Sequence, residues 1–284
     1  MTHDNNNSPA FFNGQYMPLN QVKISPLDRG FLFGDGIYEV VPVYQGKALG
    51  GEQHWQRLLQ GLQTSGIELA MTLEDLAHTA QPLLDANEAA QMLYVQVTRG
   101  VEASRKHRFP IHAEPTVLMF SSSFTPPISQ DYKGCSAWLQ QDLRWQRCSV
   151  KSISLMGNVL AYHQLWQKGV AQDEALLVRG DKVVEAPSSN LFAVIDGVIV
   201  TPPVDNILNG VTRGLVIEQA KALGFEVREQ APEIYDLPRA AEVWVSNSYE
   251  ELKPVVQLEG KPVGDGKPGP VWRQLFQSYQ SLKA

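Results

Sequence analysis

A stretch without periodicity lies near the middle of the chain and limits how the rest can fold. Residues 121–129 read SSSFTPPIS, and neither helical nor strand spacing of apolar side chains runs through them, which is typical of a linker. The length of 284 residues allows two domains, since a domain averages about 150 residues. We therefore expect a smaller domain over residues 1–122, a linker over residues 123–132 and a larger domain over residues 133–284.

The smaller domain carries signals for both strands and helices. Asn13 and Gly14 separate two apolar-aromatic segments, and this pair is the strongest short-range signal for a tight hairpin. Apolar residues recur every three or four positions over residues 54–66, which predicts a helix that ends at Gly66. The other predicted elements are strands over residues 37–44, 92–97 and 116–120 and a helix over residues 72–85 with Thr72 as its N-cap.

Short strands dominate the larger domain. Asp196 and Gly197 separate two β-rich runs and predict a further tight hairpin. Predicted strands cover residues 135–150, 175–178, 183–184, 191–195, 198–201 and 243–246, and predicted helices cover residues 159–169, 211–223 and 271–283. Strands with a few helices packed on them indicate an α+β architecture in both domains.

Composition and charge exclude several classes of protein. The net charge of −6, with no basic half, is against a nucleic-acid partner, and the apolar runs are too short to span a membrane. Cys135 and Cys148 are the only cysteines, which excludes a disulfide framework and a cysteine-based zinc site. The six histidines lack the spacing of a metal site, so we expect no metal. Because the first residues lack the features of a secretory signal, we expect a cytoplasmic protein.

Four segments combine Gly, Ser, Thr and Asn with isolated charges. They read DRGFLFGDGIYE, VKSISLMGN, VVEAPSSNLF and NGVTRG, in this order along the chain. Loops of small residues beside strands and helix starts suit an anion such as phosphate, because backbone N–H groups can approach it closely. The motifs of P-loop NTPases, α/β-hydrolases and Rossmann proteins do not occur in the sequence.

In their order and spacing, these segments resemble the fold-type IV enzymes that use pyridoxal 5'-phosphate. That family includes branched-chain aminotransferases, D-amino acid aminotransferases and aminodeoxychorismate lyases. Together with YVQVTRG and RKHRFP, the segments are most similar to the D-amino acid aminotransferases, and the resemblance extends from about Phe12 to the last predicted helix. It implies a two-domain α+β enzyme with a small N-terminal α/β domain and a larger β-rich C-terminal domain that carries the Schiff-base lysine.

The resemblance also implies which residues bind the cofactor. Lys151 matches the family's Schiff-base lysine, which must be deprotonated to act and so needs burial or nearby cations. Glu185 matches the glutamate that keeps the pyridine nitrogen of the cofactor protonated. Leu208 matches the residue that packs on the cofactor ring, although it also reads as an ordinary core leucine. The residues that match the phosphate site are Arg57, Val211, Thr212 and Ser248.

Substrate binding is implied for a second set of residues. Arg105 and His107 match a pair that holds the substrate carboxylate and that reaches in from the other subunit of a homodimer. The family's third carboxylate-holding residue is a tyrosine whose position is Phe31 here, and one lost neutral hydrogen bond costs about 0.5–1.5 kcal/mol. Alternatively, the pocket is shaped for a different substrate, with aromatic side chains that equally suit a domain core. These are Phe31, Phe33, Tyr38 and Tyr94.

The function that the resemblance implies is transamination from D-alanine or a related D-amino acid to a 2-oxo acid such as 2-oxoglutarate. A branched-chain L-aminotransferase, an (R)-amine transaminase and an aminodeoxychorismate lyase stay open as alternatives. Against the branched-chain activity, Met156 stands where that subfamily usually has tyrosine. A cofactor-binding protein without turnover, or an oligomeric scaffold, is a different class of function, and the presence of both Lys151 and Glu185 argues against it.

Overall fold

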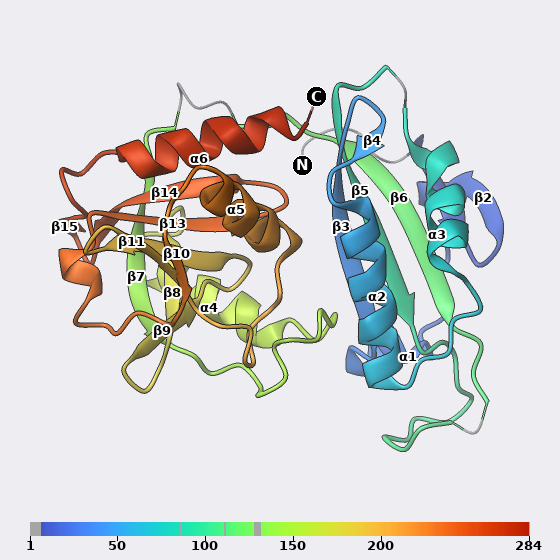
Figure 1. Ribbon diagram of the computed structural model, residues 1–284. Coiled ribbons are helices and arrows are strands. Elements are labelled where there is room, and N and C mark those ends of the chain that lie inside the picture. The colour runs from blue at the N-terminus through green and yellow to red at the C-terminus, as the bar shows by residue number, and fades with distance from the viewer. Residues whose placement is uncertain (1–6, 86, 111, 128–131, 284) are drawn as a thin grey trace. The chain divides into compact units, whose positions relative to one another are not determined.

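The computed structural model describes residues 7–85, 87–110, 112–127 and 132–283, which form two compact units (Figure 1). Unit 1 comprises Met1–Thr125 and Val150–Leu155, and unit 2 comprises Pro126–Ser149 and Met156–Ala284. The short segment that carries Lys151 therefore groups with the N-terminal part of the chain, although the sequence placed it in the larger domain. The predicted boundaries at 122 and 133 stay a prediction, and residues 128–131 of the predicted linker lie outside the described residues.

Unit 1 contains a six-stranded antiparallel sheet with the strand order β2-β1-β6-β5-β3-β4. The predicted hairpin is confirmed, because β1 and β2 pair across a two-residue turn in which Asn13 and Gly14 have φ of 47° and 88°. These left-handed values suit the twist of the flanking strands. The strands are β1 (Pro9–Phe12), β2 (Gln15–Pro18), β3 (Gly36–Tyr44), β4 (Lys47–Ala48), β5 (Ala90–Thr98) and β6 (Thr116–Ser123).

Two helices, α2 (Gly51–Ser65) and α3 (Leu73–Ala80), cover one face of this sheet (Figure 1). The helix predicted to end at Gly66 is confirmed, since Gly66 caps α2 with φ of 62°. Helix α3 is shorter than predicted because Pro82 has no N–H to donate to His78. Unit 1 also has the short helix α1 (Arg29–Phe33) and 3-10 turns at Leu19–Gln21 and Gln81–Leu83.

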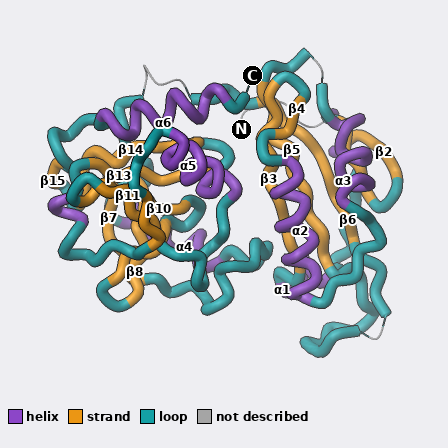
Figure 2. The backbone as a smooth tube through the Cα atoms, in the orientation of Figure 1, coloured by secondary structure: helices purple, strands orange, loops and turns teal. Residues whose placement is uncertain are grey.

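Unit 2 contains a nine-stranded sheet that closes on itself (Figure 2). Strands β10, β13, β14, β7, β8 and β9 follow one another, and β9 returns to β10 through the single pair Glu185 and Asn190. The strands are β7 (Cys135–Gln141), β8 (Glu174–Arg179), β9 (Lys182–Glu185), β10 (Asn190–Ile195), β11 (Val198–Thr201), β12 (Val227–Glu229), β13 (Glu242–Asn247), β14 (Glu251–Leu258) and β15 (Lys261–Pro262).

The described residues of unit 2 also form the helices α4 (Met156–Gln167), α5 (Val211–Ala222) and α6 (Pro270–Ser281) and a 3-10 turn at Leu237–Arg239. The apolar face of α6 buries Trp272, Leu275 and Phe276. Mixed sheets and helices in both units confirm the predicted α+β class. In the part of the chain that the structure describes, every helix is too short or too polar to cross a membrane.

Candidate active site

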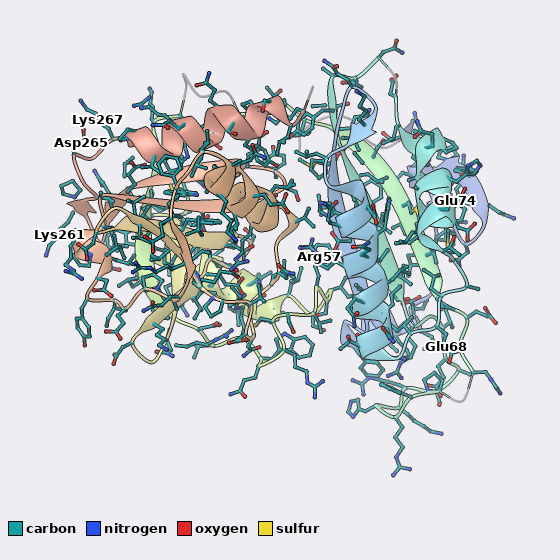
Figure 3. All side chains as sticks on the ribbon, in the orientation of Figure 1. Arg57, Glu68, Glu74, Lys261, Asp265 and Lys267 are labelled. Atoms are coloured by element: carbon teal, nitrogen blue, oxygen red, sulfur yellow. The ribbon has the colours of Figure 1, made fainter. Side chains whose placement is uncertain are left out.

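Arg57 belongs to a three-residue cluster in unit 1 whose other two members, Glu39 and His54, are buried. The side chain leaves the middle of α2 (Figure 3). Its Nε and Nη2 atoms donate to the two carboxylate oxygens of Glu39 at 2.7 and 2.8 Å, a fork-shaped pairing that fixes the plane of the guanidinium. On the same carboxylate, Oε2 accepts from Nδ1 of His54 at 2.7 Å. Glu39 therefore orients two side chains from one turn of α2.

Burial and charge decide the protonation states in this cluster. Glu39 is 0% and His54 is 1% exposed. Burial raises the pKa of Glu39, but Arg57 and His54 outweigh it and bring that pKa down to about 2. Burial also lowers the pKa of His54 below its ordinary range, despite the nearby carboxylate. At neutral pH Glu39 is thus a carboxylate, and His54 is a neutral ring that donates from Nδ1.

Lys151 lies close to this cluster in unit 1. Its segment runs beside the start of β3, where Tyr38 N donates to Lys151 O at 3.0 Å and Ile153 N donates to Gly36 O at 3.0 Å. The Lys151 Nζ atom is 4.3 Å from the centre of the Tyr38 ring. The charge of Lys151 is one of the causes that lower the pKa of His54. The structure therefore brings the predicted catalytic lysine and the predicted phosphate-binding arginine to one region.

Glu185 ends β9 in unit 2 and is 3% exposed. Its Oε1 atom forms an ion pair with Arg144 Nη2 at 2.8 Å. Its Oε2 atom accepts from Asn190 Nδ2 and from Leu208 N, both at 3.3 Å. Burial raises the pKa of Glu185 to about 7, against the opposing influence of Arg144. Near neutral pH both protonation states of Glu185 are therefore populated. A further cation beside the carboxylate would compensate for the burial and favour the charged form.

Helix α5 begins next to Glu185. Asn190 links the two, since its Nδ2 atom also donates to Leu208 O at 2.8 Å. The N-cap is Gly210, which offers no side chain to the first amides of the helix, Val211 and Thr212 among them. A Cβ atom on Gly210 would lie 2.1 Å from Asn190 Oδ1, so the close approach requires glycine. The helix start thus presents backbone N–H groups and a positive dipole end to an anion.

Ser248 lies on the turn between β13 and β14. The preceding Asn247 accepts from Tyr249 N and Glu250 N at 2.8 and 2.6 Å, which fixes the turn. Asn247 Nδ2 also donates to Ser189 Oγ at 2.8 Å, in the loop that follows Glu185. Hydrogen bonds of Asn190 and Asn247 therefore connect the segments of unit 2 that carry five of the predicted cofactor residues. They are Glu185, Leu208, Val211, Thr212 and Ser248.

The predicted carboxylate-binding pair lies on the segment between β5 and β6. Arg105 and His107 are exposed, and both contact the ring of Phe33 in α1. Phe31, two residues earlier on the same short helix, is 75% exposed. Unit 1 therefore connects Arg105 and His107 to α1, whereas Phe31 makes no ring contact in the described part of the chain.

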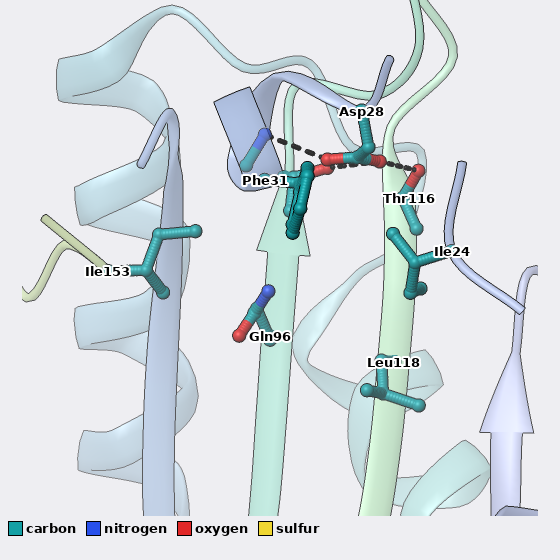
Figure 4. Close-up of a pocket in the computed structure, with 9 residues that line it drawn as sticks. Ile24, Asp28, Phe31, Gln96, Thr116, Leu118 and Ile153 are labelled. Atoms are coloured by element: carbon teal, nitrogen blue, oxygen red, sulfur yellow. Dashed lines mark hydrogen bonds between the residues drawn. The ribbon is translucent and has the colours of Figure 1, made fainter. Parts of the chain in front are cut away.

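Phe31 lines a pocket of about 380 Å³ in unit 1 (Figure 4). Apolar side chains of Ile24, Leu118 and Ile153 form part of its wall. At one end lies Asp28, whose Oδ2 atom accepts from Thr116 Oγ1 at 2.6 Å and from Thr98 Oγ1 at 3.1 Å, and whose Oδ1 atom accepts from Gly30 N at 2.7 Å. The remaining lining residues are Phe31 and Gln96. The pocket is therefore mainly apolar and contains a carboxylate that is already bonded.

Sequence reasoning missed several residues on which this geometry depends. Glu39 interrupts an otherwise apolar β-rich run, which is the one local sign that this charge is buried with a partner. His54 precedes Arg57 by three positions and so shares its helix face. Nothing local marks Arg144, because it meets Glu185 only through the folding of unit 2. Among the described residues no group of three or more His, Cys, Asp or Glu could hold a metal ion.

Comparison with known proteins decides the family. A family model described as Amino-transferase class IV matches residues 36–258. The chain belongs to the class IV aminotransferases. The matched region contains the clusters around Arg57, Lys151 and Glu185, and the predicted resemblance to the fold-type IV enzymes is confirmed.

Relatives of this class IV aminotransferase include the D-alanine aminotransferase of Staphylococcus aureus (strain MSSA476). The two are 38% identical over 273 residues, which are 95% of this chain and 96% of the relative. Among solved structures, the branched-chain amino acid aminotransferase of Escherichia coli matches with a TM-score of 0.90 at 22% identity, covering 98% of this chain and 95% of that one. This second likeness shows the shared fold.

The class IV aminotransferases use pyridoxal phosphate, and the residues of this chain fit that group. A similar structure, a T.th. branched-chain amino acid aminotransferase (TM-score 0.86, 22% identity, 97% and 94% covered), was solved with N-(5'-phosphopyridoxyl)-L-glutamate. Here, the buried Glu185 Oε1 atom accepts no hydrogen bond within the described residues, although Arg144 lies beside it. A ring N–H would satisfy that atom. Within unit 2, the start of α5 supplies backbone donors of the kind that a phosphate requires.

Proposed function

We propose that this class IV aminotransferase is a pyridoxal-phosphate-dependent transaminase that moves the amino group of D-alanine, or a related D-amino acid, to a 2-oxo acid such as 2-oxoglutarate. Lys151 carries the proposal. It lies beside the Arg57 cluster in a chain that aligns over 95% of its length with a D-alanine aminotransferase. A branched-chain L-aminotransferase is the second candidate, because the E. coli enzyme of that name shares the fold.

Each cofactor residue has a distinct task in this proposal. When bound, pyridoxal phosphate supplies a ring that accepts electrons from the reacting carbon. Lys151 Nζ binds the cofactor and, as a neutral amine, then moves the substrate proton. Glu185, as a carboxylate, keeps the ring nitrogen protonated, because an anion beside that nitrogen favours its protonated form. Leu208 supports the ring. The phosphate is held by Arg57, Val211, Thr212 and Ser248.

The substrate residues divide into polar and apolar contacts. Arg105 and His107 bind the substrate carboxylate, since a guanidinium offers two parallel hydrogen bonds to it. Phe31 has no hydroxyl and lines a mainly apolar pocket that also includes Ile153, two residues after Lys151. We therefore assign Phe31 to the substrate side chain. The pocket favours small or apolar side chains over charged ones.

A visible absorption spectrum of the purified protein loaded with pyridoxal phosphate tests the proposed function. The band of the bound cofactor should disappear on addition of D-alanine and return with 2-oxoglutarate. L-leucine and (R)-1-phenylethylamine, each in a separate cuvette, should leave the band in place. A response to L-leucine alone would assign the branched-chain activity, a response to the amine alone would assign an (R)-amine transaminase, and a protein that binds no cofactor would refute the proposal.

Replacement of the predicted carboxylate-binding arginine should act on substrate rather than on cofactor. We expect Arg105→Ala to raise the KM for D-alanine about 100-fold, since hydrogen bonds to charged groups contribute about 1.5–3 kcal/mol. The Kd for pyridoxal phosphate should stay within about twofold of wild type, because Arg105 lies outside the Arg57 and Glu185 clusters. Steady-state kinetics and a cofactor titration check both values. An unchanged KM would leave the amine transaminase as the better assignment.

We propose that the protein is a homodimer in which Arg105 and His107 serve the active site of the other subunit. Helix α4 supports a second copy, since Met156, Val159 and Leu160 are 68%, 58% and 50% exposed on one face of it. Mixing Lys151→Ala with Arg105→Ala subunits should restore activity at low D-alanine. Random reassortment gives half mixed dimers, each with one complete site, so about a quarter of wild-type activity is expected. No recovery after verified subunit exchange would contradict the shared site.

A cytoplasmic location is proposed as well. Cys135 and Cys148 are free thiols, and burial raises the pKa of both, so neither is a reactive cysteine at neutral pH. Such thiols suit a reducing compartment. Fractionation of the source cells with an antibody against the protein checks this location.

A further inference from the structure

Arg29 contacts the segment that carries Arg105 and His107. Its side chain is 4% exposed. The Nη1 atom donates to Lys106 O at 2.7 Å and to Arg108 O at 3.4 Å, and Nη2 donates to His107 O at 3.5 Å. One guanidinium therefore binds three successive backbone carbonyls. A guanidinium with several fixed acceptors holds a loop in one conformation.

The same arginine also holds the other limb of this segment. Its Nη1 atom lies 3.4 Å from Glu102 Oε2, and Glu102 Oε1 accepts from Ser104 Oγ at 3.2 Å. In addition, Arg29 N donates to Gly100 O at 2.9 Å. Arg105 stands between these two limbs in the sequence. Contacts on both sides restrict the backbone from which its side chain projects.

The ring of Phe33 connects Arg29 to the carboxylate-binding pair. Arg29 Cζ lies 4.8 Å and Arg105 Cζ lies 5.0 Å from the centre of this ring. His107 meets the same ring edge-on, with 5.3 Å between the ring centres and an angle of 70°. Cations over an aromatic face are attracted to it, and edge-on aromatic pairs are favoured. Phe33 thus touches both side chains that are to bind the substrate carboxylate.

Asp35 fixes Arg29 in turn and links it to a second buried arginine. The Oδ2 atom accepts from Arg29 Nε and from Arg99 Nε, each at 2.8 Å. Arg99 also donates to Ser65 O and Gly66 O at 2.7 and 2.6 Å, at the C-terminal end of α2. Asp35 and Arg99 therefore connect Arg29 to the C-terminal end of α2.

We propose that Arg29 and Phe33 are positioning residues that hold Arg105 and His107 in the geometry required for the substrate carboxylate. Arg29 acts on the backbone of the segment, and Phe33 acts on the two side chains. This inference rests on the proposed function, because it needs a substrate with a carboxylate. A displacement of about 1 Å in a binding group can cost about 100-fold in efficiency, which makes such support measurable.

Steady-state kinetics with D-alanine and inhibition by propionate, which has the carboxylate but no amino group, test the inference in the cofactor-loaded enzyme. Arg29→Gln should raise the KM for D-alanine and the Ki for propionate together, each by about 10- to 100-fold. Phe33→Leu, which keeps an apolar side chain and the hydrogen bonds of Arg29 but removes the aromatic ring, should raise both constants by about tenfold. In both variants kcat should fall by less than about threefold. Arg29→Lys keeps the charge but loses the fork-shaped guanidinium. Its KM for D-alanine and its Ki for propionate should lie between those of wild type and those of Arg29→Gln.

Two controls separate positioning from general loosening. Arg228→Gln removes an exposed ion pair with Glu226 in unit 2 and should change neither constant. The double variant Arg29→Gln/Arg105→Ala should lose less than the sum of the two single effects, because part of the effect of Arg29 is exerted through Arg105. Three results would overturn the inference. They are a fall in kcat as large as the rise in KM, a lowered Tm that accounts for the whole effect, and additive effects in the double variant.

Failure of the inference and failure of the proposed function give different results. If wild-type enzyme does not react with D-alanine, or if Arg105→Ala leaves KM unchanged, the proposed function fails and the inference fails with it. If Arg105→Ala raises KM while Arg29→Gln and Phe33→Leu keep wild-type KM and Ki, the function stands and the positioning role is refuted. Phe33→Leu keeps the test decisive if Arg29→Gln does not fold.

Discussion

Lys151→Ala should lower kcat for transamination of D-alanine by at least about 1000-fold, since a positioned general base contributes about 100- to 10,000-fold and the lysine also binds the cofactor. The fold should persist, because the hydrogen bond that Tyr38 donates to residue 151 involves only the backbone. The measurement is the rate at which the band of the bound cofactor disappears after rapid mixing with D-alanine.

Matched controls make this result specific. Lys267→Ala removes an exposed lysine of unit 2 and should keep wild-type rates. Far-ultraviolet circular dichroism of Lys151→Ala should match wild type. A small amine such as methylamine, added at high concentration, should restore part of the activity because it replaces the missing base. Transamination at a rate near that of wild type in Lys151→Ala would refute the role of this lysine, and with it the proposed mechanism.

Glu39→Gln should destabilise unit 1 by about 3 kcal/mol, because Arg57, whose side chain is 14% exposed, loses its charge partner. It should also weaken binding of pyridoxal phosphate at least about tenfold, since the fork that orients Arg57 is lost. The chain has two units, so the free energy of opening is best read from hydrogen exchange of α2 peptides, with the cofactor Kd from a titration.

The control for this variant is Glu74→Gln, which changes an exposed carboxylate at the start of α3 in the same unit (Figure 3). Its effect should stay within about 0.5 kcal/mol. If Glu39→Gln protects α2 amides and binds cofactor as well as wild type does, the Glu39 cluster holds neither the helix nor Arg57.

The same cluster predicts how stability depends on pH. The folded-state pKa of Glu39 is about 2, against an ordinary value of 4.5, so its contribution is complete above pH 4.5 and is lost as the pH falls towards 2. His54 is buried with a lowered pKa, so the unfolded chain takes up a proton more readily as the pH falls through 6.5. Both groups reduce stability in acid. The difference between wild type and Glu39→Gln should therefore shrink between pH 4.5 and pH 2.

Local signals predicted most of the elements, and long-range pairing explains most of the exceptions. Asn13-Gly14 and Asp196-Gly197 define their hairpins within four residues, since left-handed φ values specify the turn directly. Strand β14 was not predicted, because Pro254 stands inside it opposite Trp244, and proline normally argues against an inner strand. Helix α1 is not predicted either, because the sequence of its segment is typical of turns. Its Asp28 N-cap accepts from Gly30 N.

The residues of the candidate site also differ in how far the sequence predicts them. A family resemblance singled out Lys151, Arg57 and Glu185, whereas propensity and spacing alone do not distinguish them from surface charges. Their partners Glu39 and Arg144 come from distant parts of the chain, so no short window of sequence contains the pairing. Electrostatic networks of this kind become visible only when strands and helices are packed.

The closed sheet of unit 2 has a consequence for how substrate preference can change over time. The pair of Glu185 and Asn190 that joins β9 to β10 belongs to the backbone closure of that sheet, so the residue proposed to control the ring nitrogen is fixed by strand pairing. Arg105 and His107 lie on a connecting segment of a different sheet. Substitutions in that segment can alter the accepted substrate without disturbing the closure, which makes the chemistry and the selectivity separately adjustable by mutation.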